Sequence, residues 1–250
     1  MTDSPYKNMR DLGGLKCPAG VIKQNMIFRA PRLTGETAEE REYLDTLAPD
    51  CIIDLRSREE QTELPDYVPE GTRLISAPAL KPGEYKYIIV TTKAKLSCLF
   101  LKGRAINRLY EEKERSYREM PFEKAAFEKI FDCMDKGLRF VFHCTEGKDR
   151  TGVAAALTEL SLGRSEQEIT EEYLLSNELR PRKDRSSLRF FGASARLIDA
   201  IAYCESTHEE LIKATFDCIK AQYGDTAAFL RELYGVTDER LEAWQRLYTE

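Results

Sequence analysis

One stretch constrains the fold more than any other: a strand pattern that runs into a short polar loop and then into a helix pattern. Residues 140–152 read FVFHCTEGKDRTG, with an apolar run that ends at Phe142 and a helix pattern that begins near Arg150. A strand followed directly by a helix is the repeating unit of α/β folds. Such folds gather their binding sites at the carboxyl ends of their strands, so this loop is the first candidate for a site.

The rest of the chain alternates strand and helix patterns in the same way. Short runs rich in β-branched and aromatic residues predict strands at residues 26–28, 50–55, 73–76 and 139–142, which would form a buried sheet. Apolar residues at helical spacing predict helices at residues 37–47, 122–136, 152–162, 165–177, 208–223, 227–234 and 238–248. We therefore expect a single α/β domain over residues 1–250, with a central, mostly parallel, twisted sheet flanked by helices.

The predicted helices carry local start and stop signals. Thr37 is a candidate N-cap because Glu40 follows three residues later, which is the spacing of a capping box. Glycines at 163, 224 and 235 follow predicted helices and are expected to end them.

Composition excludes several classes of protein. No apolar run approaches the roughly 18 residues of a membrane span, and the polar start MTDSPYKN lacks the pattern of a signal peptide. We therefore expect a cytoplasmic protein, although export by a route without such a peptide stays open. The net charge of −5 argues against a nucleic-acid partner. The seven cysteines are scattered without Cys-x-x-Cys spacing, which favours neither a disulfide framework nor a zinc site.

Basic residues concentrate in one segment of this acidic chain. Residues 81–121 hold ten Lys or Arg against five Asp or Glu, and a second basic run occupies residues 180–185. Both runs could be solvated faces, which is the common role of charge runs. We expect residues 81–121 to be a basic helical insertion, which would act as a mobile lid or pack as an extra helical layer.

The loop after the strand at 139–142 has the chemistry of a phosphate site. Unpaired amides and the positive end of the following helix attract a dianion, and Gly147 allows a close turn. The same dipoles and the Arg150 charge favour the thiolate form of Cys144. Arg150 can bind two phosphoryl oxygens at once, in the ground state and in the transition state. The sequence therefore predicts a nucleophilic Cys144 and a phosphate-binding Arg150. A buried structural Cys144 is the alternative.

These residues resemble the phosphate-binding loop, HCxxGKDRTG, of the cysteine-dependent protein tyrosine phosphatase superfamily. The Lys-Asp pair in the loop is similar to that of bacterial tyrosine and dual-specificity phosphatases that also accept phosphoinositides. Three further segments resemble the same family: Asn8 to Gly14, Ile27 to Ala30, and Ile53 to Ser57 followed by Glu59. The resemblance also reaches the segments 223–233 and 236–237, and it is weakest in residues 81–121.

The resemblance implies a metal-free, cofactor-free hydrolysis of phosphomonoesters through a phosphocysteine. Cys144 would attack, the loop residues Thr145, Glu146, Gly147 and Lys148 with Arg150 would bind the phosphoryl group, and the Thr151 hydroxyl would hydrogen-bond the Cys144 sulfur. Asp149 is the candidate general acid, or alternatively a brace for Arg150. Asp54 and Glu146 are the other candidate acids. Supporting roles fall to His143, Asp54, Arg56 and Gly152, although Asp54 and Arg56 could instead form a surface ion pair.

Three functions remain open at this point. The first is a phosphatase acting on phosphotyrosine, and also on phosphoserine or phosphothreonine, in proteins. The second is a phosphoinositide or inositol-phosphate phosphatase, in which Lys148 and the basic segment would bind further phosphates. The third is a non-catalytic phosphate-binding module, which the presence of both Cys144 and Arg150 disfavours.

Overall fold

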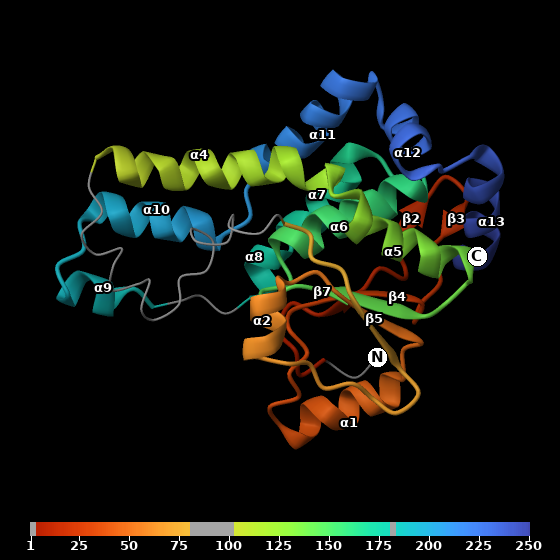
Figure 1. Cartoon of the computed structure of the whole chain (residues 1–250), viewed down its shortest axis with the longest axis horizontal. Helices are drawn as coiled ribbons and strands as arrows, with labels where there is room; N and C mark the ends of the chain where they lie inside the picture. The colour runs from red at the N-terminus through yellow and green to blue at the C-terminus, as the bar shows by residue number, and fades with distance from the viewer. Residues whose placement is uncertain (1–3, 81–102, 181–183) are drawn as a thin grey trace.

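A five-stranded sheet forms the centre of the computed structural model, which describes residues 4–80, 103–180 and 184–250 (Figure 1). The strand order is β1 (Arg10–Asp11), β4 (Ile27–Ala30), β7 (Phe140–His143), β5 (Cys51–Asp54) and β6 (Arg73–Ser76). The last four run parallel, whereas β1 pairs antiparallel with β4. A separate hairpin joins β2 (Lys16–Cys17) and β3 (Gly20–Val21). The predicted mostly parallel sheet is confirmed.

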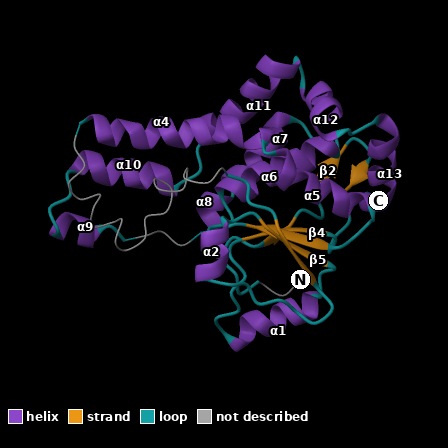
Figure 2. Ribbon diagram, in the orientation of Figure 1, coloured by secondary structure: helices purple, strands orange, loops and turns teal. Residues whose placement is uncertain are grey.

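Alternate residues of the central strands face two different helical layers. Ile52 and Val141 pack with Leu44 of α1 (Ala38–Leu47), whereas Ile53 and Phe142 pack in the larger cluster on the opposite face. That cluster contains α5 (Lys124–Asp135) and α6 (Asp149–Ser161), which cover the face opposite α1 (Figure 2). Strands buried on both faces read as continuous apolar runs, which is how they appear in the sequence.

The edge strand β6 departs from the prediction of a buried sheet. Its four residues have the predicted bounds, but Leu74 is 45% exposed and most of its neighbours in the strand are exposed too. An edge strand pairs on one side only, so its apolar residues are less covered than those of β5 and β7.

The remaining helices follow in the second half of the chain, and most match the predicted ranges. They are α7 (Glu166–Leu174), α8 (Ser176–Leu179), α9 (Ser186–Phe190), α10 (Ala195–Glu205), α11 (Glu209–Tyr223), α12 (Thr226–Tyr234) and α13 (Asp238–Tyr248). The predicted N-cap at Thr37 forms a complete capping box with Glu40. Gly224 and Gly235 are the C-caps of α11 and α12.

The sequence-based prediction missed α9, α10 and the short helix α2 (Arg58–Glu63). The predicted range 152–162 also begins three residues after the start of α6. No helix among the described residues is long and apolar enough to cross a membrane.

The described part of the predicted insertion is a long helix. Residues 103–121 form α4 (Arg104–Glu119) and most of a 3₁₀ turn, Met120–Phe122. One face of α4 is buried, and Ile106 and Leu109 on that face pack against α10 (Figure 1). The mobile lid predicted within residues 81–121 falls in part on residues 81–102, which lie outside the described residues.

A buried ion-pair network ties the N-terminal strands to α7. Glu172 on α7 accepts a hydrogen bond from Arg10 Nε at 2.6 Å, and its other oxygen binds Arg29 of β4. Burial alone would raise the pKa of Glu172, but the charges of Arg29 and Arg10 outweigh it and lower that pKa. Arg29 is fully buried and also donates from Nη2 to the Gly147 carbonyl at 3.1 Å. The network therefore connects α7, β4 and the loop after β7.

We expect Glu172→Ala to lower the free energy of unfolding by about 3–5 kcal/mol, because it leaves Arg29 buried without its carboxylate partner. Urea unfolding measures the change. Glu171→Ala is the matched control, since Glu171 is the exposed neighbour on the same helix. Equal losses in the two variants would contradict a structural role for the buried network.

Candidate active site

Three parallel strands end together at the candidate site. Ala30, Asp54 and His143 are the last residues of β4, β5 and β7, and the strand register pairs His143 with both of the others. The chain then runs from His143 through residues 144–148 into α6. The site therefore lies at the carboxyl edge of the sheet, where α/β folds place their ligands.

Gly147 fixes the course of the loop. Its φ is +64°, a conformation that side chains disfavour, and a Cβ there would lie 2.8 Å from the Ala30 backbone. Asn8 Nδ2 donates to the carbonyls of Gly147 at 2.9 Å and Glu146 at 3.1 Å. With Arg29, these bonds hold the loop carbonyls away from its centre. Asn8, the first residue of the Asn8 to Gly14 segment, therefore lies beside the loop.

The loop is built to receive an anion. Within the described part of the chain, the backbone amides of Thr145, Gly147 and Lys148 donate no hydrogen bond. They precede α6, whose amino end adds a positive dipole. Cys144, at 2% exposure, opens this loop directly after β7. Unpaired amides that precede a helix form a concave site for a phosphate-sized dianion.

Glu60 holds the predicted phosphate-binding arginine. Arg150 Nη1 and Nη2 donate to the two Glu60 oxygens at 2.7 and 3.1 Å, and Nη2 also lies 3.3 Å from Thr145 Oγ1. Thr145 Oγ1 donates to Glu60 as well. Burial lowers the pKa of Arg150, and the Glu60 carboxylate opposes that shift. The glutamate assigned from the sequence, Glu59, is exposed, so the buried glutamate of this segment is Glu60.

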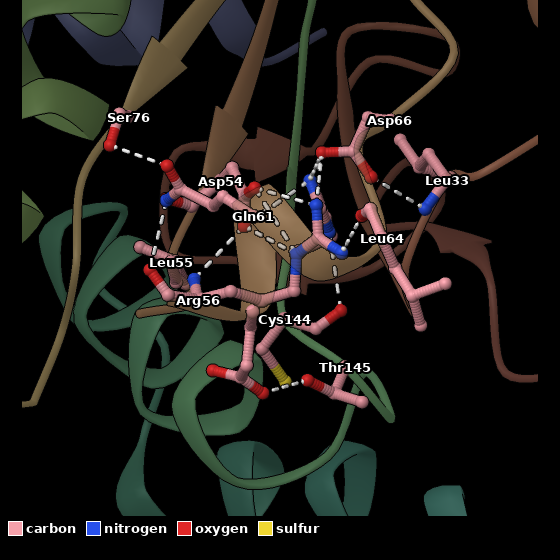
Figure 3. Close-up of polar contacts among 12 residues, drawn as sticks. Leu33, Asp54, Leu55, Arg56, Gln61, Leu64, Asp66, Ser76, Cys144 and Thr145 are labelled. Atoms are coloured by element: carbon pink, nitrogen blue, oxygen red, sulfur yellow. Dashed lines mark hydrogen bonds and ion pairs between the residues drawn. The ribbon is translucent and has the colours of Figure 1, made fainter. Parts of the chain in front are cut away.

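A second buried cluster supports the loop from the β5 side. Arg56 donates to Asp54 through Nε at 2.9 Å and through Nη2 at 2.7 Å, and the same Nη2 lies 2.7 Å from Asp66. Figure 3 shows Arg56 reaching both carboxylates beside Cys144. Asp54 is 2% exposed, so the surface ion-pair interpretation is wrong, whereas its supporting role stays a prediction.

His143 completes this cluster. Its Nε2 lies 3.1 Å from Asp66 Oδ2 and 3.7 Å from Asp54 Oδ1, an ion-pair contact without the alignment of a hydrogen bond. Burial lowers the pKa of His143, but Asp66 and Asp54 outweigh that effect and raise it. Asp54, Asp66 and His143 lie close enough to hold a metal ion, yet Arg56 already supplies a cation to both carboxylates. We propose that the cluster positions the strand end before Cys144.

Asp149 is the first residue of α6 and is held by α4. Its Oδ1 accepts hydrogen bonds from Lys113 Nζ and Tyr117 Oη, each at 2.5 Å. Burial would raise the pKa of this carboxyl, but Lys113 and Lys148 hold it well below its usual range. Asp149 makes no contact with Arg150 that the described residues show, so a brace for that arginine is not its role here.

The side chains of Lys148 and Glu146 bind neighbouring segments, whereas the phosphate contacts predicted for these residues are those of their backbone amides. Lys148 is 2% exposed, and its Nζ donates to the Cys204 carbonyl of α10 at 2.7 Å. Burial lowers the pKa of Lys148 to about 7. Glu146 Oε2 accepts a hydrogen bond from Arg180 at 2.5 Å. The loop side chains at these two positions therefore fasten the loop to α10 and to the segment after α8.

The residues after Arg150 are closely packed. Gly152 lies against Tyr173 so closely that a Cβ would come within 2.8 Å of its ring. The Thr151 hydroxyl is fully buried without a hydrogen-bond partner among the described residues, so its predicted bond to the Cys144 sulfur is not formed here.

Comparison with known proteins identifies the family. The model of the tyrosine phosphatase family matches residues 4–250. This chain belongs to the tyrosine phosphatase family. Members of this family are phosphatases and hence hydrolases.

Two named relatives match the phosphatase over most of its length. A protein of Cupriavidus necator named as a tyrosine-protein phosphatase is 27% identical over 228 residues, which cover 90% of this chain and 80% of the relative. The triple specificity protein phosphatase PtpB of Mycobacterium tuberculosis is 24% identical and covers 90% of both chains. Among solved structures, P. aeruginosa TpbA with phosphotyrosine matches at a TM-score of 0.32 and 15% identity, covering 86% of this chain and 98% of TpbA.

Sequence reasoning missed three residues that hold the phosphatase loop. Glu60 could have been recognised from the sequence as a capping-box residue, because it follows Ser57 by three residues and completes the capping box of α2. Asp66 and Lys113 come from segments distant in sequence, and only the fold brings them to the site. Lys113 had a partial signal, since it is a lysine on the buried face of an amphipathic helix.

We expect Glu60→Gln to lower kcat of the phosphatase by about 10²-fold, because Arg150 loses its charged, two-oxygen partner and shifts within the loop. Steady-state kinetics with a phosphotyrosine peptide measures the loss. Glu59→Gln is the control on the exposed side of α2 and should retain the wild-type rate. If both variants behaved alike, Glu60 would not be the residue that orients Arg150.

Gly147→Ala tests the loop conformation. The added Cβ meets the Ala30 backbone and also requires an unfavourable φ, so we expect loss of activity and a large loss of stability. Gly224→Ala is the control, because Gly224 also has a positive φ but nothing lies within 4 Å of its Cβ. It should cost only about 1–2 kcal/mol of backbone strain in thermal unfolding. An active Gly147→Ala enzyme would contradict the tight loop.

Proposed function

We propose that this chain hydrolyses phosphomonoesters through a phosphocysteine intermediate on Cys144, with phosphotyrosine in proteins as its main substrate. Phosphoserine and phosphothreonine would be slower substrates, because their alkoxide leaving groups depend more on protonation. One observation carries the proposal. Cys144 opens a loop in which the amides of Thr145, Gly147 and Lys148 donate no hydrogen bond to any described residue, and the loop ends in a buried, glutamate-oriented Arg150.

The first step would transfer the phosphoryl group to sulfur. The phosphate dianion would bind the loop amides and Arg150, and the Cys144 thiolate would attack phosphorus. As the sulfur–phosphorus bond forms, the bond to the tyrosine oxygen breaks, and that oxygen takes a proton from the general acid. The amides and Arg150 are fixed before substrate arrives, so they stabilise the transition-state charge without reorganisation.

In the second step, water would attack the phosphocysteine and pass a proton to the carboxylate left by the general acid, releasing inorganic phosphate and returning Cys144 as a thiolate. The Thr151 hydroxyl, which is buried without a partner among the described residues, is placed on the first turn of α6 just after the loop. We assign it to stabilising the departing sulfur, through a hydrogen bond that would form during this step.

Asp149 remains the proposed general acid. Asp54 binds Arg56 deep in the cluster, whereas the Asp149 side chain keeps 15% of its surface exposed. Asp149 is ionised without substrate, so it would gain its proton as the phosphate dianion enters and raises its pKa by repulsion.

The phosphoinositide alternative loses one of its two supports. It relied on Lys148 and on the basic segment to bind further phosphates, but the Lys148 side chain is buried against the end of α10. The non-catalytic alternative remains disfavoured because the loop retains both Cys144 and an oriented Arg150.

Phosphate release from three substrates tests the proposal: a phosphotyrosine peptide, a phosphoserine peptide and a phosphoinositide, each with chelator present. We expect release to be fastest from the phosphotyrosine peptide and to fall at least about 10³-fold in Cys144→Ser, which removes the nucleophile. Cys218→Ser, a cysteine change on α11, should retain full activity.

Two outcomes would contradict the proposal. Release that persists in Cys144→Ser would exclude the phosphocysteine, and a phosphoinositide preference would exclude phosphotyrosine as the main substrate. Trapping of a sulfur-bound phosphate by rapid acid quench, detected by mass spectrometry, gives an independent measure of the intermediate.

A further inference from the structure

The helix α4 places a lysine where its sequence pattern calls for an apolar residue. Its buried positions are Ile106, Leu109, Lys113, Ser116 and Tyr117, which form one face at helical spacing. Lys113 is 3% exposed, and a lysine is almost never buried to this extent without a partner. That partner is Asp149, 36 residues further along the chain.

Hydrogen-bond geometry distinguishes the two oxygens of Asp149. Oδ1 accepts from both Lys113 Nζ and Tyr117 Oη at 2.5 Å, whereas Oδ2 has a longer contact of 3.5 Å to Lys148 Nζ. Because the single Tyr117 hydroxyl proton points to Asp149, Tyr173 must donate in the 2.6 Å contact between the two tyrosines. A directed chain from Tyr173 through Tyr117 therefore ends on Oδ1.

The backbone of α4 is itself fixed at this point. Thr215 of α11 donates from Oγ1 to the Tyr117 carbonyl at 2.9 Å. Lys113 also lies with its ammonium 5.4 Å from the centre of the Tyr117 ring. The Lys113 and Tyr117 side chains thus start from a helix that α11 holds in place.

We propose that Lys113, together with Tyr117, is a positioning residue of the phosphatase site: it occupies Oδ1 of Asp149 and leaves Oδ2 to carry the proton to the leaving group. The proposal rests on the proposed function, in which Asp149 is the general acid. It assigns α4, from the basic segment of the sequence, a direct part in setting the pH range of the reaction.

The pH dependence involves the charged and titratable groups that face Asp149 within the described part of the chain. These groups are Lys113 and Tyr117 on α4, Lys148 in the loop, Tyr173 on α7 and Cys204 on α10. Lys113 stabilises the carboxylate, so its removal favours the protonated acid. The acid then keeps its proton to higher pH.

The pH profile of kcat for a phosphotyrosine peptide tests the proposal, because kcat reports the enzyme–substrate complex in which Asp149 holds its proton. In Lys113→Met we expect the alkaline limb to move up by about one pH unit or more, because one adjacent cation is lost. Lys113→Arg should keep the limb near the wild-type position. Arg115→Met is the matched control, since it removes a positive charge from the exposed face of the same helix.

A double-variant cycle separates Asp149 from Lys148, whose pKa of about 7 could shape the same limb. In an Asp149→Asn background, Lys113→Met should no longer move the limb. Three outcomes would each overturn the proposal. They are a shift of the limb that persists in the Asp149→Asn background, no shift in Lys113→Met, and an equal shift in Arg115→Met. p-Nitrophenyl phosphate, a substrate with a better leaving group, should show a smaller shift.

Stability gives a readout that does not require catalysis. Lys113→Met should lower the melting temperature, and adding Asp149→Asn should restore most of the loss, because no unpaired carboxylate then remains buried. If the losses of melting temperature in the two single variants simply add in the double variant, the contact between Lys113 and Asp149 would be overturned. If the wild type released no phosphate at all, the proposed function would fail, whereas this coupling would still be measured.

Discussion

The approach of Gly147 to the backbone of Ala30 is the constraint on which the candidate site depends. A Cβ at this position would lie 2.8 Å from the carbonyl that ends β4, so the loop follows its course only with glycine there. The contact turns the Gly147 carbonyl toward Arg29 and Asn8. The amides of Thr145, Gly147 and Lys148 are then left without a hydrogen-bond partner among the described residues. The anion site thus depends on this backbone contact together with the Asn8 and Arg29 side chains that hold the loop carbonyl.

Around this turn, each buried arginine forms an ion pair with one or two buried carboxylates. Arg29 binds Glu172, Arg150 binds Glu60, and Arg56 binds Asp54 and Asp66. A buried pair gives little net stability, but removing one partner is costly, so each pair strongly disfavours alternative arrangements. Because Arg150 enters the site already oriented, substrate binding need not pay to order that side chain.

The central strands and most helices could be predicted because their signals are local. The apolar run at 139–142 and the capping box at Thr37 can each be recognised from neighbouring residues alone. The prediction of roles for Cys144 and Arg150 also used only neighbouring residues. The partners of the loop could not be predicted in this way. Asp66 reaches His143 only through the strand order, and Lys113 reaches Asp149 only through the packing of α4. Lys148 looked like a substrate contact because sequence does not show that α10 covers it.

The adjacency of Lys148 and Asp149 has a mechanical consequence. These two consecutive residues bind two different helices, since Lys148 donates to the end of α10 and Asp149 accepts from α4. The two helices lie side by side and extend away from the sheet (Figure 1). Any sliding of one helix along the other would therefore twist the chain at a single peptide bond, between the loop and the first turn of α6. The opposite side of the loop, anchored by Asn8 and Arg29, would stay in place and act as the pivot.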